Sequence, residues 1–138
     1  MQKITKIFVM FFAITMLSMI TVSASAYPVS QTASIQPRYV GVDSVISTLY
    51  ISSSGRADVG GQLEVIPGYT ASVTVTLYKD SNSFVQSWSS SGRGSIYVQK
   101  SHYVASGHDY YVTLSATIYD RNGKVADTVI KDSTVVSY

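Results

Sequence analysis

Cysteine is absent from the 138-residue chain. The fold therefore contains no disulfide bond, and its hydrophobic core must hold it together without a cross-link. The same absence excludes zinc sites built on thiolate ligands and a lipid anchor attached to a cysteine side chain. We expect the protein to use neither thiol chemistry nor thiolate-bound metal.

Charged residues are also scarce, at 13% of the chain. Two of the ten basic residues, Lys3 and Lys6, lie in a segment that we expect to be removed, whereas all eight acidic residues follow it. The remaining chain then has a net charge of zero and contains no run of basic residues. We therefore expect no binding to nucleic acid or to anionic membranes.

Residues 1–26 have the three parts of a secretory signal peptide. Lys3 and Lys6 supply the positive start, residues 7–22 are mostly apolar, and Ala24-Ser25-Ala26 offers the small residues that signal peptidase requires. The apolar stretch is close to the length that spans a membrane, so a retained transmembrane helix is the competing interpretation. The small-residue site, with no charge directly after it, favours cleavage.

The chain that remains after cleavage would begin at Tyr27 and carry no membrane contact. Residues 27–38 include Pro28 and Pro37 and are predicted to form an extended N-terminal arm. Residues 39–138 are long enough for one domain with a modest core. We therefore predict a secreted, extracellular protein with a single folded domain.

Two stretches alternate between apolar and polar or aromatic residues, which is the pattern of a strand with one buried face. In residues 71–78 the odd positions are apolar, and in residues 110–119 the even positions are apolar. Weaker runs rich in β-branched residues are predicted as further strands at 45–51, 57–66, 84–89, 95–99 and 125–136. Gly60-Gly61 predicts a β-bulge in the second strand, and a change of face predicts another in the last strand.

Turn residues separate these strands at short intervals. Ser52–Gly55, Asp80–Ser83 and Asp120–Gly123 are turn sequences, and Gly123 suits a left-handed conformation. The chain has no helical periodicity and no internal repeat. These features predict an all-β fold, a seven-stranded antiparallel sandwich of the immunoglobulin or fibronectin type III kind.

Residues 104–116 read Val-Ala-Ser-Gly-His-Asp-Tyr-Tyr-Val-Thr-Leu-Ser-Ala. This segment resembles the sixth strand of fibronectin type III domains, whose pattern is Leu-x-Pro-Gly-Thr-x-Tyr-x-Val-x-Val-x-Ala, although Ser106 and His108 depart from it. The resemblance implies a tyrosine corner, in which the Tyr110 hydroxyl group binds upstream backbone. The tryptophan of that family's second strand is missing, because the only tryptophan, Trp88, follows the third strand.

Over its whole length the chain is also similar to small secreted β-sandwich proteins of Gram-positive bacteria. That resemblance implies export and a single β domain. It implies no particular activity.

Tyrosine is unusually frequent, with eleven in the chain. If the strands at 71–78 and 110–119 are antiparallel neighbours, their outward faces place Tyr78 near Tyr111, with hydroxyl side chains between them and Tyr119. A flat surface of aromatic rings and hydroxyl groups suits a glycan or a protein partner. The alternative, which we favour, is that these cross-strand pairs only stabilise an exposed sheet.

The position of Trp88 depends on the register of the turn near Asp80. A four-residue loop pairs Val75 with Trp88 and turns the indole inward, whereas a five-residue loop places Phe84 and Trp88 on the outer face. We favour the core, because a buried tryptophan commonly anchors such sandwiches. The candidate binding face therefore comprises Tyr78, Tyr111, Tyr119 and, in the second register, Trp88.

Candidates for catalysis are few. Only His102 and His108 could act as a base, and no Gly-x-Ser-x-Gly motif is present. Asp120-x-Asn122-Gly123 is only a fragment of a calcium loop, and two histidines without cysteine make no structural zinc site. We predict no catalytic residue, no metal and no cofactor.

Two functions remain open. The first, which we favour, is a non-catalytic extracellular binding or interaction module for a cell-wall polymer, a glycan or a protein partner. The second is a secreted antagonist, such as a bacteriocin-like protein or an inhibitor of an extracellular enzyme. Retention on purified cell wall or glycans would favour the first, and inhibition of neighbouring strains or proteases would favour the second.

Overall fold

The computed structural model describes residues 38–138. The predicted signal peptide, 1–26, and the predicted arm, 27–38, lie outside the described residues except for Arg38. No helix in the described part is long and apolar enough to cross a membrane.

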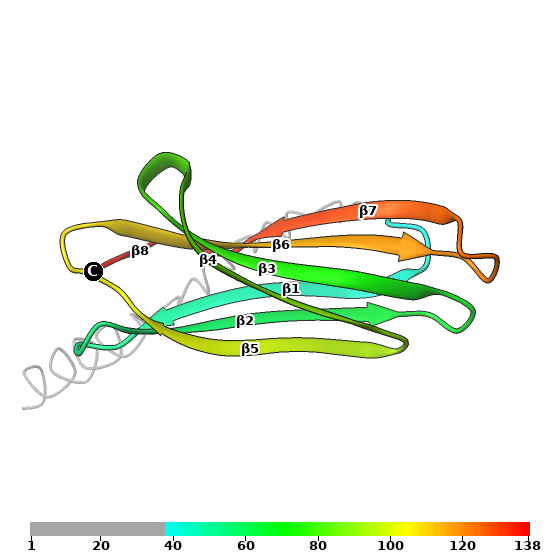
Figure 1. The fold of residues 1–138 in the computed structure, drawn as a ribbon, viewed down its shortest axis with the longest axis horizontal. Coiled ribbons are helices and arrows are strands. Elements are labelled where there is room, and N and C mark those ends of the chain that lie inside the picture. Colours follow the sequence, from blue (N-terminus) through cyan, green and yellow to red (C-terminus); the bar gives the residue numbers. More distant parts are fainter. Residues whose placement is uncertain (1–37) are drawn as a thin grey trace, which may run out of the picture. The chain divides into compact units, whose positions relative to one another are not determined.

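The described chain forms two antiparallel β-sheets (Figure 1). The three-stranded sheet has the order β1-β2-β5, formed by β1 (Val42–Ile51), β2 (Arg56–Val65) and β5 (Ser95–Tyr103). The second sheet has the order β4-β3-β6-β7, formed by β4 (Ser83–Gly92), β3 (Thr70–Lys79), β6 (Asp109–Tyr119) and β7 (Val125–Asp132). A short strand, β8 (Val136–Ser137), also pairs with β6. The all-β, antiparallel prediction is confirmed, and each of the seven predicted strands is present.

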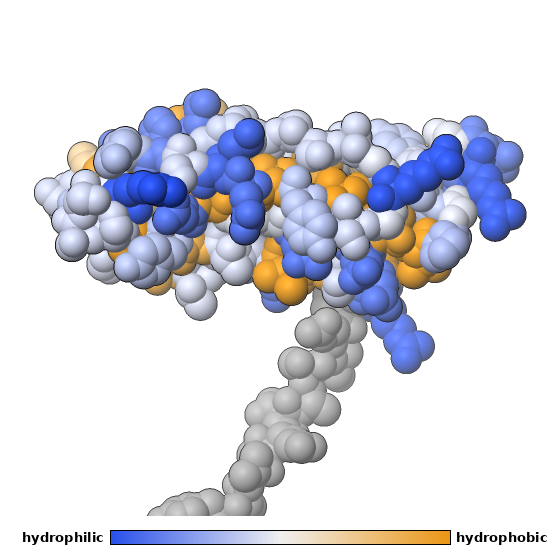
Figure 2. All heavy atoms as spheres, turned by 90° about the horizontal axis from the view of Figure 1, so that it is seen from below, coloured by the Kyte–Doolittle hydropathy of each residue, from blue (hydrophilic) through white to orange (hydrophobic). Residues whose placement is uncertain are grey.

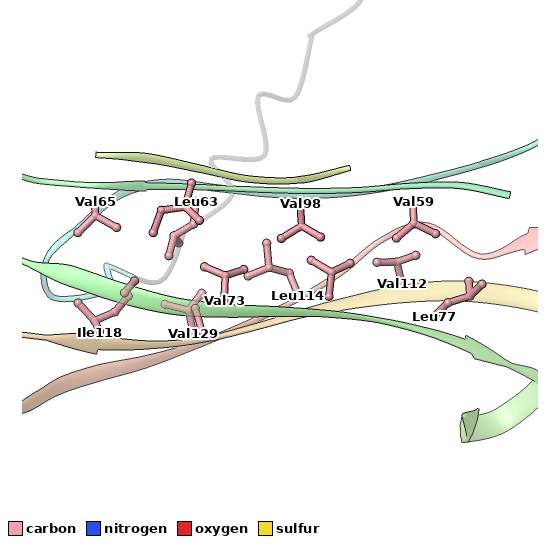
Figure 3. Close-up of a cluster of buried hydrophobic side chains, with 14 of the residues drawn as sticks. Val59, Leu63, Val65, Val73, Leu77, Val98, Val112, Leu114, Ile118 and Val129 are labelled. Atoms are coloured by element: carbon pink, nitrogen blue, oxygen red, sulfur yellow. The ribbon is translucent and has the colours of Figure 1, made fainter. Parts of the chain in front are cut away.

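The core lies between the inner faces of the two sheets, where aliphatic side chains from both sides meet (Figure 3). The strict alternation of β3 and β6 produces this arrangement, because every second residue of a strand points to the same face. The apolar positions of these two strands are buried as their alternation predicts, and those fully buried include Val73, Val75, Leu77, Val112, Leu114 and Ile118. From the other sheet, β2 contributes the buried side chains Ala57, Val59, Leu63 and Val65.

The β-bulge predicted at Gly60-Gly61 is wrong. The register of β2 runs without a shift through both residues against β1 and against β5, and the odd positions of β2 stay buried throughout. Gly61 is instead required by the packing of the two sheets, because a Cβ atom there would collide with Val75 and Leu114. The irregularity in this sheet lies at the start of β1, between Val42 and Ser44.

The last predicted strand, 125–136, is not continuous with a bulge midway, as predicted, but is divided into two strands. The strand β7 ends at Asp132, three residues intervene, and the chain returns to β6 as β8. Within the gap, the Ser133 hydroxyl group accepts a hydrogen bond from the Val112 backbone at 2.9 Å. A further register shift lies near the start of β7, opposite Ile118 and Tyr119.

The tyrosine corner implied for Tyr110 is present. Its side chain is 2% exposed, and its hydroxyl group donates a hydrogen bond of 2.7 Å to the carbonyl oxygen of Ala105. Burial raises the pKa of the Tyr110 hydroxyl group. The hydroxyl group therefore anchors the loop before β6 to the core.

Candidate functional site

The aromatic face predicted on β3 and β6 is only partly assembled. Tyr78 and Tyr111 lie opposite each other, with ring centroids 5.3 Å apart and planes 19° from parallel. Tyr119 lies on the same face but at the far end of β6, where it pairs with Thr70. The tyrosines of this face therefore form one stacked pair and one separate ring.

The stacked Tyr78 and Tyr111 side chains contact each other and neighbouring residues of the same domain. Each ring covers part of the other, and the Tyr111 hydroxyl group donates a hydrogen bond to the side-chain oxygen of Asn82 in the turn between β3 and β4. Asp80 in the same turn binds His108 through an Oδ2 to Nδ1 distance of 2.8 Å. These contacts tie the turn to β6, which is a structural role and agrees with the interpretation we favoured.

Trp88 does not belong to this face. It lies opposite Val75, a fully buried residue of β3, and is half-buried against the core. Opposed residues project to the same side of a sheet, so the indole points inward, as we favoured. Trp88 is therefore removed from the candidate binding face, which keeps Tyr78, Tyr111 and Tyr119.

The observed pairing of β3 with β4 combines features of the four-residue and the five-residue loop. Tyr78 lies opposite Phe84, as the five-residue loop required, but a shift directly after this pair places Val75 opposite Trp88. The extra residue is Val85, which is half-buried against the core. One bulge therefore leaves Phe84 on the outer surface, 62% exposed, and turns Trp88 inward.

Small hydroxyl side chains fill the rest of the outer face of β4, β3 and β6. The opposed positions form three consecutive rows: Ser87, Thr76 and Thr113; Ser89, Thr74 and Ser115; Ser91, Ser72 and Thr117. Some of these groups bind their neighbours, as Thr74 and Ser89 do at 2.9 Å between hydroxyl oxygens.

A recess is found on the opposite sheet, on the outer face of β1-β2-β5. We call it the Gly60 groove; it has a volume of about 650 Å³ and its lining includes Thr48, Tyr50, Arg56, Asp58, Gly60, Gln99 and Ser101. Gly60 lies between Thr48 and Gln99 in the sheet and leaves the space that a side chain would fill. A Cβ atom at Gly60 would reach the hydroxyl group of Thr48, so the groove depends on this glycine.

A hydrogen-bonded network lines one side of the Gly60 groove. The Arg56 guanidinium lies 3.0 Å from Asp58 Oδ1 and donates to the Ser101 hydroxyl group, which itself donates to Asp58 at 2.7 Å. The Ser101 hydrogen bond, followed by the Arg56 charge, holds the pKa of Asp58 below its usual value of 3.8. Asp58 is therefore an ionised acceptor at neutral pH, held in place by two donors.

Exposed tyrosines border the same face. Tyr50 lies opposite Asp58 and is 65% exposed, whereas Tyr103 lies opposite Arg56 and is 73% exposed. Unlike Tyr78 and Tyr111, these rings have no aromatic partner among residues 38–138. Of the two rings, Tyr50 lines the Gly60 groove, which thus combines an open ring face with oriented polar groups that could orient a ligand.

Sequence patterns alone do not reveal this site. Its tyrosines lie on strands with weak alternation, and the Gly60-Gly61 pair predicts a bulge that the structure does not contain. The signal that could have found it is the outward parity of Tyr50, Asp58 and Ser101 once β1, β2 and β5 are aligned.

The two histidines lie apart. His108 binds Asp80, and its hydrogen bond is the first cause that holds the pKa of Asp80 below the usual range. His102 lies in β5 with its ring 6.3 Å from that of Trp88. Among the described residues no hydroxyl group is hydrogen-bonded to either histidine, and no cluster of three potential metal-ligating side chains occurs.

Hydrophilic and apolar side chains are interspersed on the face drawn in Figure 2. On the face in Figure 2, the most hydrophilic residues are separated by residues of intermediate hydropathy and by apolar patches.

No family model matches the chain, and comparison with curated proteins found no significant similarity.

Proposed function

We propose that the described domain belongs to the immunoglobulin-like class of β-sandwiches, in its fibronectin type III form. The strand order supports this assignment, because β1, β2 and β5 share one sheet and β3, β6 and β7 share the other, as in these folds. The buried Tyr110 hydroxyl bond to Ala105 supports it further, since it has the position of the tyrosine corner.

Within that class, the protein is a secreted, non-catalytic module that binds a saccharide chain in the Gly60 groove. The observation that carries this proposal is the exposed ring of Tyr50 beside the Arg56–Asp58–Ser101 network. A sugar ring offers an apolar face of C–H groups, which stacks on tyrosine, and a rim of hydroxyl groups, which bind a fixed carboxylate and guanidinium.

The open form of the groove fits a chain better than a small molecule. It lies on the outer surface of a sheet, between strands, so that a polymer can enter and leave along the surface without a closing lid. Arg56 and Asp58 neutralise each other, and Lys100 adds one positive charge to the lining. The ligand that suits the groove is therefore a neutral or weakly acidic glycan of the cell envelope or of the surroundings.

Glycan-array and cell-wall retention assays test the proposal. We expect the purified protein to be retained, and Tyr50→Ala to weaken binding about tenfold, equivalent to about 1.4 kcal/mol. Gly60→Thr should abolish binding, because its side chain fills the groove while keeping a residue type that strands accept.

The control is Tyr111→Ala on the opposite sheet, which should leave binding unchanged. Loss of binding in Tyr111→Ala together with normal binding in Tyr50→Ala would move the site to the stacked tyrosine pair. Retention on no glycan or cell-wall fraction would contradict the proposal.

A further inference from the structure

A second hollow lies at the end of the sandwich where three turns meet. These turns join β2 to β3, β4 to β5 and β6 to β7, and they are found together at the right of Figure 1. The hollow has a volume of about 490 Å³, and its lining includes Gly68, Tyr69, Arg93, Asp120 and Arg121. The Gly60 groove lies toward the other end, where β1 stops and β2 starts, so the two sites are separate.

Two arginines from different turns line this hollow, and neither forms an ion pair with another residue of the described part of the chain. The ion pairs of the described residues are Arg56–Asp58 and His108–Asp80, and neither includes Arg93 or Arg121. Asp120 also lines the hollow, and its Oδ1 accepts the backbone N–H groups of Asn122 and Lys124 at 2.8 and 3.0 Å. The single negative charge of Asp120 can balance only one of the two guanidinium groups, so the lining keeps a net positive charge.

A glycine leaves room for the Arg121 side chain. Gly68 has φ +98°, and a Cβ atom there would lie 2.8 Å from Arg121 Nε, so the guanidinium lies close to the Gly68 backbone. A guanidinium presents several N–H groups in a flat fork, which matches the geometry of an oxyanion.

We propose that this hollow is an oxyanion site, which binds a phosphate or carboxylate group between Arg93 and Arg121. Both arginines line the same hollow, and an oxyanion between them would balance the net positive charge while accepting paired N–H bonds from each guanidinium. The site is independent of the Gly60 groove, and its proposal does not rest on saccharide binding there.

Titration of the purified, ¹⁵N-labelled protein with inorganic phosphate tests the site. We expect saturable shifts of the amide signals of residues 68–69, 93–94 and 121–123. The Arg93→Gln/Arg121→Gln variant should bind about tenfold more weakly or worse, because it loses charge-assisted hydrogen bonds. A Lys79→Gln/Lys131→Gln variant removes the same charge elsewhere and should bind normally.

A third variant separates geometry from charge. Arg121→Lys keeps the positive charge but loses the fork, and we expect weaker binding than in the unaltered protein. Shifts that do not saturate, equal affinity in the arginine double variant, or full affinity in Arg121→Lys would each overturn the proposal. A thermal melt of each variant checks that the fold is intact.

Retention on two polymers then identifies the source of the oxyanion. A poly(glycerol phosphate) matrix presents phosphodiesters, and a polygalacturonate matrix presents carboxylates. Retention on either, lost in the arginine double variant, supports the site and names its ligand. Retention on neither contradicts a role in binding an anionic polymer.

Discussion

Tyr110 and Tyr111 are neighbours in β6, yet their hydroxyl groups have different surroundings. The Tyr110 hydroxyl group is buried and binds Ala105, whereas Tyr111 is half-buried on the outer face and binds Asn82. We expect Tyr110→Phe to lower the free energy of unfolding by about 1–2 kcal/mol, because it removes a bond and leaves the carbonyl oxygen unpaired. Urea denaturation measures this change.

Tyr111→Phe is the matched control. Its hydroxyl group can be replaced by water, so we expect a loss below about 0.5 kcal/mol. Equal losses from the two substitutions would refute the assignment of Tyr110 to the inner face and Tyr111 to the outer face.

The free energy of unfolding should depend on pH in the acid range because of the carboxyl groups of Asp58 and Asp80. Hydrogen bonds, chiefly from Ser101 and His108 respectively, hold the two pKa values below the usual 3.8. Their contribution to stability is complete above 3.8 and is lost as the pH falls through the lower, folded-state values. We expect the urea midpoint to fall in this acid range, and to fall less in Asp80→Asn.

A control for this pH effect is Asp120→Asn, because Asp120 lies in the turn between β6 and β7 and is bonded to neither Ser101 nor His108. A pH profile in Asp80→Asn that matches that of the unaltered protein would show that the His108 contact contributes nothing to acid stability. The measurement is a series of urea denaturation curves at decreasing pH.

At the scale of the strand, the two adjacent glycines of β2 have different surroundings, one in the core and one on the outer face. Gly61 faces Val75 and Leu114 across the core, whereas Gly60 faces the exposed side chain of Thr48. We expect Gly61→Ala to cost about 1–3 kcal/mol through overpacking, and Gly60→Ala to change stability by less than about 0.5 kcal/mol, because Thr48 can rotate. Comparable losses in both variants would mean that Gly60 also has a structural role.

Adjacent residues of β6 provide a second comparison. Leu114 is fully buried, whereas Thr113 lies on the outer face and donates a hydrogen bond of 2.6 Å to Asp132. Leu114→Ala should cost about 2–5 kcal/mol through lost burial and a cavity, a large share of the 5–15 kcal/mol typical of a whole domain. Thr113→Ala should cost under about 1 kcal/mol, and thermal melts of the two purified variants decide between them.

The strands with strict alternation could be predicted from sequence, because one buried face imposes period two on β3 and β6. The Tyr78–Tyr111 pair followed from that alternation once the two strands were taken as neighbours. The place of Trp88 could not be fixed in the same way, since a single bulged residue, Val85, decides which face follows it. The role of Gly61 depends on side chains of two other strands, so a pattern within β2 alone could not reveal it.

The candidate sites are less predictable than the strands because they form only when strands or turns far apart in sequence meet. Tyr50, Asp58 and Ser101 become neighbours through the pairing of β1, β2 and β5. Arg93 and Arg121 meet through two turns of different hairpins. No local spacing in the sequence marks either group.

At the scale of the whole molecule, cleavage of the predicted signal peptide would produce a protein with a defined N-terminus. If signal peptidase cleaves after Ala26, N-terminal sequencing of the protein from the culture medium will begin at Tyr27. A cell-associated product that still contains residues 1–26 would instead favour the retained membrane helix.

The order of the strands also determines how the domain would respond to mechanical force. The described chain enters β1 at the end near the β2–β3 turn and leaves β8 at the opposite end, so tension applied through these two points runs along the strands. β8 has only two paired residues and should detach first, whereas β1 shares nine pairs with β2 that must slide together. Stretching a single molecule should therefore give a small early extension followed by a strong resistance, which is the behaviour of a domain able to carry load between two anchored points.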